Sequence, residues 1–324
     1  MQGFGPDYAD PPDYILKVTR QIWEDRGIAT LRRSYAPDIL VRSPASIVQG
    51  NQGVIAATLA TLAEFPDRTL LGEDVIWAEA GEGAFLSSHR LYSQATHLGD
   101  GAYGPATGRP LRYRIIADCH ARGDVIDDEW IIRDQGAIVR QMGQDPRDWA
   151  ADRIAAHQAA HGAPPPPPFR PEDDRPGPYR GAGNADEWGE RYADLLTRIM
   201  AADFAAIPAE YDRACRLEHP GGVSGASHAD ADRFWMGLRA AFPSATFTVH
   251  HRIGRDDPLM PPRAAIRWSL DGPHDGWGAF GPPTGARVHV MGLCHAEFGP
   301  WGLRREWALY DETAVWTQIL LHQG

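Results

Sequence analysis

The sequence predicts an α+β protein made of two copies of one domain. Three observations support this prediction. A segment of distinctive sequence occurs twice at a fixed spacing. Each half starts with apolar residues at helical spacing and continues in short runs that are typical of strands. A Pro-rich stretch separates the two halves. Helices followed by a series of antiparallel strands are typical of the α+β class.

The repeated segment occurs once in each half of the chain. Residues 97–108 read HLGDGAYGPATG, residues 274–285 read HDGWGAFGPPTG, and eight of the twelve positions are identical. The repeat offset, which takes residue 97 to residue 274, also aligns other residues without a gap. It aligns Arg90 with Arg267, Glu129 and Trp130 with Glu306 and Trp307, Asp134 with Asp311, and Gln141 with Gln318. One offset that holds over this length indicates a tandem duplication of a unit of about 140 residues.

Helices are expected first in each copy. Tyr14, Val18 and Ile22 recur at helical spacing near the N-terminus. A second helix is predicted over 53–64, where a Phe-Pro pair follows it, and its counterpart over 230–241. Strands separated by Gly-rich turns are predicted over 75–80, 84–94, 111–121 and 125–133.

The two copies are expected to span residues 1–143 and 185–324, with residues 144–184 between them. Residues 148–161 are Ala-rich and predicted to be helical, whereas the five prolines of 164–168 must be extended. We interpret this segment as a tail helix of the first copy followed by a solvated connector. A docking motif for a partner is the alternative.

Composition and charge narrow the classes of function. The chain of 324 residues is 43% hydrophobic and 23% charged, which is typical of a globular protein. Its 32 basic and 43 acidic residues give a formal net charge of −11, which argues against binding to nucleic acid or to anionic membranes. No apolar run reaches the length of a membrane span, and the N-terminus lacks the features of a signal peptide. A cytoplasmic protein with a small-molecule partner is therefore expected.

Neither a metal nor a cofactor is expected. The three cysteines have no paired spacing, so they predict neither a disulfide framework nor a zinc site. No set of histidines and carboxylates has the spacing of metal ligands, and no Gly-rich loop leads into a helix as a dinucleotide motif would.

The order of the motifs resembles a known family. Arg, His-x-Gly, Gly-Pro-x-Thr-Gly, Glu-Trp-x-x-x-Asp and Gln follow one another in both copies, over 13–142 and 186–323. This order is similar to that of the SnoaL-like polyketide cyclases and ester cyclases of the nuclear transport factor 2-like superfamily. The resemblance implies two cystatin-like cones, each with N-terminal helices packed on a curved antiparallel sheet around a pocket. Because family members commonly dimerise sheet against sheet, it also implies a pseudo-dimer within one chain. A higher homo-oligomer stays open.

The resemblance also implies where proton transfer would take place. In the cyclases, an aspartate on the last strand moves a proton at an acidic C–H of the substrate. Counting from the Gly-Pro-x-Thr-Gly turn, Ile131 and Ala308 occupy that position, and Ala117 and Cys294 occupy the position of a pocket histidine. This departure favours a reaction other than ordinary aldol cyclisation, or a binding role.

Two pairs of residues shared by the copies are candidate acid/base groups. His97 and His274 could act as general bases at a pocket mouth, or could fix the glycine turn that follows them. Glu129 and Glu306 each precede a tryptophan on a strand, so glutamate and tryptophan should point to opposite faces. A buried glutamate with a raised pKa would carry protons, whereas a cross-strand salt bridge is the alternative.

Asp118 and His120, and in the second copy His295, share one side of the penultimate strand. They could orient one another for base catalysis. Alternatively, this polar side is the surface between the copies and the apolar side lines the pocket. The sequence leaves both readings open.

The remaining candidates would bind the substrate. Arg90 and Arg267 could hold a carboxylate or phenolate, or could form salt bridges on the outer face. Tyr92 and Trp268 suit an aromatic ligand, although most tryptophans are expected to fill cores. Asp134 and Asp311 close the last strands and are expected to be turn or cap residues.

These residues together predict a cofactor-independent enzyme that applies acid/base chemistry to a hydrophobic or aromatic metabolite. A cyclase, isomerase, hydratase or lyase would fit. The alternative is a non-catalytic binding or scaffold protein of the same fold. The copies differ, since residues 35–38 have no clear counterpart in the second half. We therefore expect one active cone and one structural partner.

Overall fold

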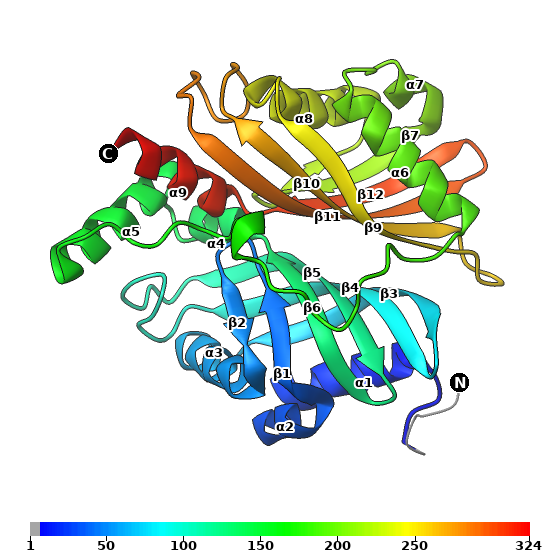
Figure 1. Cartoon of the computed structure of the whole chain (residues 1–324), viewed down its shortest axis with the longest axis horizontal. Helices are drawn as coiled ribbons and strands as arrows, with labels where there is room; N and C mark the ends of the chain where they lie inside the picture. The colour runs from blue at the N-terminus through cyan, green and yellow to red at the C-terminus, as the bar shows by residue number, and fades with distance from the viewer. Residues whose placement is uncertain (1–6) are drawn as a thin grey trace.

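The chain folds into two α+β halves that pack against each other (Figure 1). The computed structural model describes residues 7–324. The first half contains α1 (Pro11–Trp23), α2 (Leu31–Ser34), β1 (Tyr35–Arg42), β2 (Ile47–Gln49), α3 (Gly50–Glu64), β3 (Thr69–Gly81), β4 (Ala84–Thr96), β5 (Pro110–Arg122), β6 (Val125–Arg133), α4 (Gln135–Gln141) and α5 (Pro146–His161). The second contains α6 (Glu187–Met200), α7 (Ala206–Glu210), β7 (Tyr211–His219), β8 (Val223–Gly225), α8 (His228–Ala241), β9 (Thr246–Arg255), β10 (Arg263–Pro273), β11 (Arg287–Gly299), β12 (Gly302–Tyr310) and α9 (Glu312–Gln323).

The two sheets have the same topology. The strand orders are β2-β1-β6-β5-β4-β3 and β8-β7-β12-β11-β10-β9, so each strand of the first half has one equivalent in the second. The four long strands of each sheet form an antiparallel meander. The α+β class is therefore confirmed. The purely antiparallel sheet that the resemblance implied is corrected, because β1 runs parallel to β6 and β7 runs parallel to β12.

Strand β1 was not predicted from any sequence pattern. It contains Pro37, which has no N–H to donate to a neighbouring strand. The structure accommodates this proline in an irregular stretch, where the register against β6 shifts between Tyr35 and Leu40. Regular pairing then resumes from Leu40 to Arg42.

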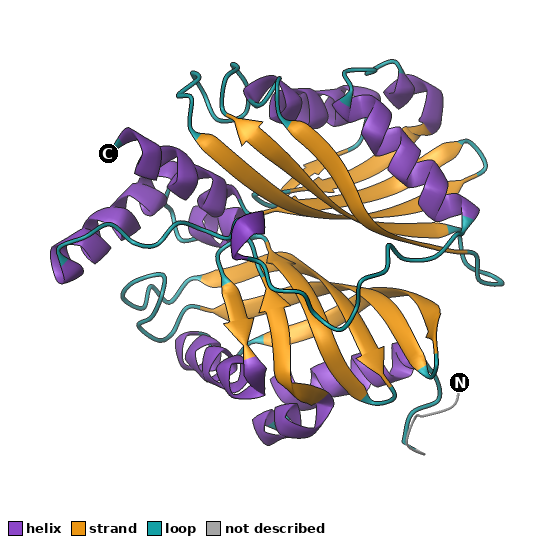
Figure 2. Ribbon diagram, viewed as in Figure 1, coloured by secondary structure: helices purple, strands orange, loops and turns teal. Residues whose placement is uncertain are grey.

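Helices cover one face of each sheet, and the other face meets the second sheet (Figure 2). Helix α1 shows how the local sequence produces this layer. The Asp10 side chain accepts a hydrogen bond from the Asp13 amide at 2.8 Å and caps the helix, and prolines occupy its first turn. Tyr14, Val18 and Ile22 then form a buried stripe that faces the sheet, as their helical spacing predicted.

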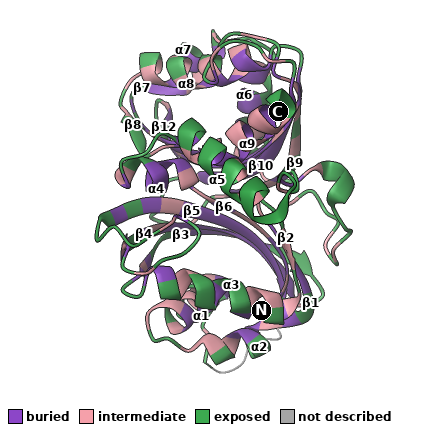
Figure 3. Ribbon diagram, turned by 90° about the vertical axis from the view of Figure 1, so that its left-hand side faces the viewer, coloured by how far each residue is buried: buried purple, intermediate pink, exposed green. Residues whose placement is uncertain are grey.

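The outward faces of the two sheets form a buried contact (Figure 3). One cluster of side chains at this contact comes from both halves and from the connecting segment, and comprises Ile116, Ile132, Phe169, Met291, Leu293, Trp307 and Leu309. A second cluster contains Ile76, Ala78, Leu86, Ile253 and Ala265. The halves therefore pack sheet against sheet within one chain.

The connecting segment is anchored over much of its length. The tail helix is present as α5, and it packs against α9 of the second half. The expectation of a solvated connector holds at residues 171–176, which are exposed, but not throughout the segment. Phe169 is buried between the sheets, and the Tyr179 ring stacks on His120 with a centroid distance of 5.0 Å. The Tyr179 hydroxyl also lies 3.1 Å from Nε2 of His251. Burial of these aromatic rings holds the segment against both halves.

Three further features of the described residues bear on the expected partners. No helix within residues 7–324 is long and apolar enough to cross a membrane. Over the same range, no three histidines, cysteines or acidic residues cluster in a way that could hold a metal ion. All three cysteines are buried free thiols.

Candidate active site

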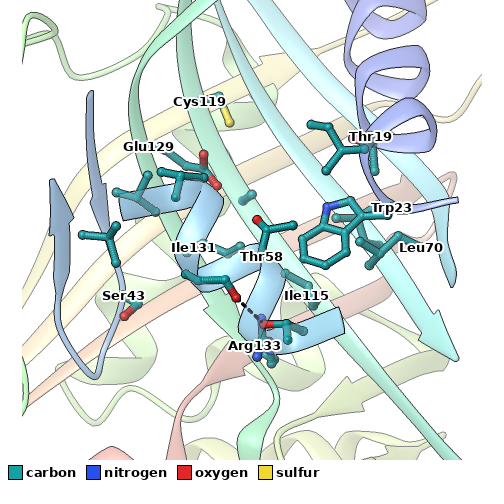
Figure 4. Close-up of a pocket in the computed structure, with 18 of the residues that line it drawn as sticks. Thr19, Trp23, Ser43, Thr58, Leu70, Ile115, Cys119, Glu129, Ile131 and Arg133 are labelled. Atoms are coloured by element: carbon teal, nitrogen blue, oxygen red, sulfur yellow. Dashed lines mark hydrogen bonds between the residues drawn. The ribbon is translucent and has the colours of Figure 1, made fainter. Parts of the chain in front are cut away.

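A cavity of about 280 Å³ lies in the first half, between its helices and its sheet (Figure 4). Helix α1, helix α3, the turn at 43–45 and the inward faces of β4, β5 and β6 supply its walls. The walls are mainly apolar, and their larger side chains include Ile15, Val18, Ile22, Leu91, Ile115 and Ile131. Such a cavity suits a small, largely apolar molecule.

The face of β5 that lines this cavity is the apolar one. Ile115, Ala117 and Cys119 line the cavity, while Asp118 and His120 point to the opposite face, as alternation along a strand requires. Pairing of β5 with β4 is regular over its whole length, so no bulge exchanges the two faces. This settles the question that the sequence left open about the penultimate strand.

Glu129 on β6 is the carboxylate of the cavity. Its side chain is buried, and Oε2 has no hydrogen-bond partner. Burial raises the pKa of Glu129 to about 7, and the charge of Asp128 adds to this effect, whereas the neighbouring Tyr35 hydroxyl opposes it. The next residue, Trp130, faces the other sheet and stacks against Arg267. The expectation that glutamate and tryptophan point to opposite faces is therefore confirmed.

Three consecutive inward positions of β6 cross the cavity. Glu129, Ile131 and Arg133 follow one another along the strand, with Ile131 in the middle (Figure 4). Ile131 thus occupies a position that faces the cavity, although it cannot transfer a proton. Cys119 also lines the cavity, and burial raises the pKa of its thiol well above the ordinary value. That thiol is therefore neutral at physiological pH, which makes it a poor nucleophile.

The cavity contains two basic residues that the sequence analysis did not single out. Arg133 reaches it from the end of β6, and Arg68 reaches it from the turn before β3. Alternation would have placed Arg133 on the face of Glu129. Arg68 follows the Phe-Pro pair that ends α3 and carried no motif of its own. Tyr35 was likewise not identified as the neighbour of Glu129.

The equivalent volume in the second half is filled by larger side chains. At the repeat offset, Thr58 corresponds to Trp235 and Leu91 to Trp268, and both tryptophans are fully buried. Gly292 stands where the first half has Ile115, and its lack of a side chain makes room for the ring of Trp268. Arg133 corresponds to Tyr310.

Glu306, the counterpart of Glu129, is enclosed by hydrogen-bond donors. Its Oε1 accepts bonds from the hydroxyls of Tyr192 at 2.9 Å and Tyr211 at 2.7 Å. Its Oε2 accepts a bond from Nε1 of Trp235 at 3.2 Å. Both carboxylate oxygens are therefore satisfied by the core itself.

Tyr211 is also the counterpart of Tyr35. Tyr35 pairs with Ile126 on β6, and Tyr211 pairs with Leu303, which corresponds to Ile126 at the repeat offset. The expectation that residues 35–38 lack a counterpart is thus corrected at Tyr35. The match was hidden because the interval from Tyr35 to Tyr211 is shorter than the repeat offset by a single position.

His97 and His274 lie in the repeated loops and not among the residues that line the cavity. His97 is buried, with Nδ1 at 3.1 Å from Oγ1 of Thr107 and Nε2 at 3.3 Å from Oε1 of Glu64. Nδ1 of His274 makes the equivalent contact with Thr284 at 3.1 Å. These contacts fix the glycine turns that follow each histidine.

Arg90 and Arg267 lie between the sheets. Arg90 stacks on Trp307, and Arg267 stacks on Trp130, each with its guanidinium carbon 3.5 Å from the ring centroid. Arg267 also lies 3.7 Å from Oδ2 of Asp118. These contacts are related by the repeat and contribute to the packing of one half on the other.

The polar residues of the penultimate strands belong to the same contact. Asp118 lies 3.5 Å from His251 of the second half. His295 hydrogen-bonds Ser88 at 2.7 Å and Arg90 at 3.0 Å. His120 pairs with Asp127. The structure therefore brings these residues together, but at a distance from the cavity that contains Glu129.

The last candidates also lie outside the cavity. Tyr92 is half-buried beside Arg114, whose guanidinium carbon lies 5.2 Å from the ring centroid. Trp268 belongs to the core of the second half. Asp134 and Asp311 cap α4 and α9 through their side chains, so the prediction that they are cap residues is confirmed. The Asp134 carboxylate in addition accepts hydrogen bonds from the amides of Gly221 and Gly222.

Comparison with known proteins identifies a family for the second half. Residues 190–303 match the SnoaL-like domain family. No curated protein sequence matches the chain.

Solved structures also match a part of the chain. IdmH, described as a candidate polyketide cyclase from Streptomyces antibioticus, is 24% identical with a TM-score of 0.36, and the match covers 42% of this chain and 99% of that chain. A SnoaL-like polyketide cyclase from Agrobacterium tumefaciens is 20% identical with a TM-score of 0.33, and the match covers 41% of this chain and 98% of that chain.

Proposed function

We propose that the whole chain is a tandem of two SnoaL-like domains, of which the first is the enzyme, since residues 190–303 of the second half match that family. In this proposal the first half removes and returns a proton on a small hydrophobic or aromatic metabolite. The proposed proton donor is a carbon next to a carbonyl group of that metabolite. Such a proton transfer would serve a cyclase, isomerase, hydratase or lyase.

The observation that supports this proposal is the state of Glu129. A buried carboxylate is costly unless hydrogen bonds or charges compensate it. Glu129 keeps one oxygen without a partner in an apolar cavity, and burial holds its pKa near neutrality. A general base works best when its pKa lies close to the working pH. Glu129 is therefore equipped to take a proton from a bound molecule.

The proposed step needs no group from outside the chain. The Glu129 carboxylate accepts the proton, and the electron pair of the broken C–H bond moves toward the carbonyl oxygen as an enolate. The neutral carboxylic acid then returns the proton to the same or to another carbon. Hydrophobic walls exclude water and so keep the carboxylate a strong base.

We further propose a division of labour between the copies. Residues 1–143 are the catalytic domain, residues 185–324 are a supporting domain, and residues 144–184 connect them. The hydrogen bonds around Glu306 and the tryptophans beside it support the second assignment. A catalytic role for His97, His274, Asp118, His120 or His295 forms no part of this proposal, because none of them lines the cavity.

The proposal is tested by proton exchange on 2-tetralone, a bicyclic aromatic ketone with acidic C–H groups. The full chain in heavy water is expected to accelerate loss of the α-proton signals, followed by nuclear magnetic resonance. Glu129→Gln should lower the catalysed rate by roughly 100-fold or more, since general acid/base groups contribute effects of that size.

The matched control is Glu306→Gln, which changes the equivalent carboxylate in the second half. This variant should retain the exchange rate of the unmodified chain. If 2-tetralone binds but its exchange is the same with Glu129→Gln, Glu129 is not the base. The chain would then be a binding protein of the same fold.

A further inference from the structure

The end of the cavity away from Glu129 is positively charged. Arg68 is fully buried, and its guanidinium carbon lies 4.2 Å from the centroid of the Trp23 ring. Its Nε donates a hydrogen bond to Oγ of Ser93 at 3.2 Å. Arg133 is half-buried, with the hydroxyl of Tyr103 beside it. The proximity of Arg133 contributes to the lowering of the pKa of Arg68 to about 10, for which burial is the main cause.

Neither guanidinium has a carboxylate partner in the part of the chain from residue 7 to residue 324. No acidic oxygen lies within 4.0 Å of either group there. Nη1 of Arg68 and Nε of Arg133 are buried without a hydrogen-bond partner. Asp311 also lines the cavity, and its charge is one of several that raise the pKa of Arg133 against the opposing effect of burial, but its Oδ1 is engaged in capping α9. Two neighbouring cations without an ion-pair partner, one fully buried and one half-buried, are costly, and an anion between them would offset that cost.

We propose that Arg68 and Arg133 form a subsite for a carboxylate, so that the molecule bound in the cavity is an apolar, aromatic-sized organic acid. The subsite itself stands on the two guanidinium groups. Only the position of the reacting carbon, next to Glu129, rests on the proposed function. A guanidinium binds a carboxylate through charge-assisted hydrogen bonds with defined geometry, which would orient the ligand.

The spacing along β6 sets the size of that ligand. Glu129 and Arg133 are four residues apart on one face of the strand, which corresponds to about 13 Å between their backbone positions. Their side chains both point into the cavity, and Ile131 lies between them. The ligand would therefore carry its carboxylate at one end and its acidic C–H near the other, with apolar rings between.

The second half lacks the same charges. At the repeat offset, Arg68 corresponds to Ala245 and Arg133 to Tyr310. Both arginines are thus absent from the half in which bulky side chains fill the equivalent volume. This correlation fits a role of the two arginines toward a ligand.

The test compares two probes that have the same rings but different charge. Binding of 2-naphthoate and of the neutral 2-naphthamide to the full chain is measured by isothermal titration calorimetry. We expect the carboxylate to bind at least roughly ten-fold more tightly, because hydrogen bonds to charged groups are worth more than neutral ones. Equal affinity for the two probes would overturn the proposal.

Variants assign the preference to the two arginines. Arg133→Gln and Arg68→Met should each reduce the ratio of the two affinities by several-fold, while binding of the neutral probe changes little. Arg32→Gln, which removes an exposed arginine of α2, should leave the ratio unchanged. If Arg68→Met fails to fold, Arg133→Gln decides alone. A ratio that survives Arg133→Gln would also overturn the proposal.

Glu129→Gln separates this proposal from the proposed function. Removal of a negative charge from the cavity should leave naphthoate binding as tight or tighter, even though proton exchange on 2-tetralone is lost. Retained exchange with Glu129→Gln contradicts the catalytic proposal alone. Equal binding of naphthoate and naphthamide contradicts the carboxylate subsite alone.

Discussion

Glu129 and Glu306 show how neighbours decide what one shared position of the repeat can do. Both glutamates are buried on the same inward face of equivalent strands. Tyr192, Tyr211 and Trp235 complete the hydrogen bonds of Glu306, so its charge is compensated by the core. Glu129 has an open volume beside it instead. The difference lies in the residues around the carboxylate and not in the carboxylate itself.

The raised pKa of Glu129 predicts a pH-dependent effect on stability. The folded-state pKa of Glu129, about 7, exceeds the reference value of 4.5. The stabilising contribution of this side chain to the fold is therefore fully present below that reference value. The contribution is lost as the pH rises through about 7, at a total cost of about 3 kcal/mol. The Glu129→Gln variant has no ionisable group at this position. Its unfolding free energy relative to that of the unmodified chain should therefore rise by about 2 kcal/mol from about pH 5 to about pH 8. Urea denaturation at both pH values measures this gain.

Glu306→Gln serves as the comparison in the same experiment, because it removes the equivalent carboxylate from a site where hydrogen bonds already compensate its charge. A relative stability of Glu129→Gln that is the same at both pH values would show that the Glu129 carboxylate has an ordinary pKa. It would also remove one support for a base that works near neutrality.

At the scale of elements, one cross-strand pair distinguishes the two halves. Leu91 on β4 faces Ile115 on β5, whereas Trp268 on β10 faces Gly292 on β11. A Cβ atom added to Gly292 would lie 2.0 Å from Cε2 of Trp268. In the second half, β10 therefore supplies the one large side chain of this pair. The ring of Trp268 fills the space over the sheet that stays open in the first half.

Gly292→Ala should destabilise the protein by about 2 kcal/mol, because overpacking a rigid core costs about 1–3 kcal/mol. The loss should be much smaller in a Trp268→Leu background, which restores the residue type of the first half. Urea denaturation of the two single variants and the double variant measures this coupling. Equal losses in both backgrounds would show that the ring of Trp268 is not what excludes a side chain at position 292.

At the scale of the molecule, the two halves are held together by more than the connecting chain. Arg90 on Trp307 and Arg267 on Trp130 form two related contacts across the sheets. Phe169 adds an aromatic side chain from the connecting segment to the same buried cluster. The exposed prolines before Phe169 therefore have little to do with keeping the halves together.

A cut in the chain tests this view. Residues 163–167 can be replaced by a protease site, because this stretch is largely exposed. After cleavage, the two fragments should still elute together in size-exclusion chromatography at micromolar concentration. Trp307→Ala in the cleaved protein should weaken the association of the fragments, since it removes the ring on which the Arg90 guanidinium stacks. Separation of the fragments without that substitution would show that the connection is what holds the halves together.

The α+β class and the main helices and strands could be predicted from the amino-acid sequence, and the internal repeat could be read from it directly. Periodicity and a constant offset are local properties, so they can be read without a structure. Alternation also placed Glu129 and Trp130 on opposite faces of β6. By contrast, β1 includes a proline and pairs in parallel with β6, which lies far away in the chain. No local sequence pattern therefore predicted this strand.

Which face of each strand borders the cavity could be learned from the packed molecule alone. The polar faces of β4, β5, β10 and β11 meet across the sheets, which places Arg90, Asp118, Arg267 and His295 in that contact. The apolar face of β5 borders the cavity instead. Strand alternation defines two faces but not their surroundings. The packing of helices on one face and of the second sheet on the other supplied that information. It also showed that Glu129, Arg68 and Arg133 line one cavity.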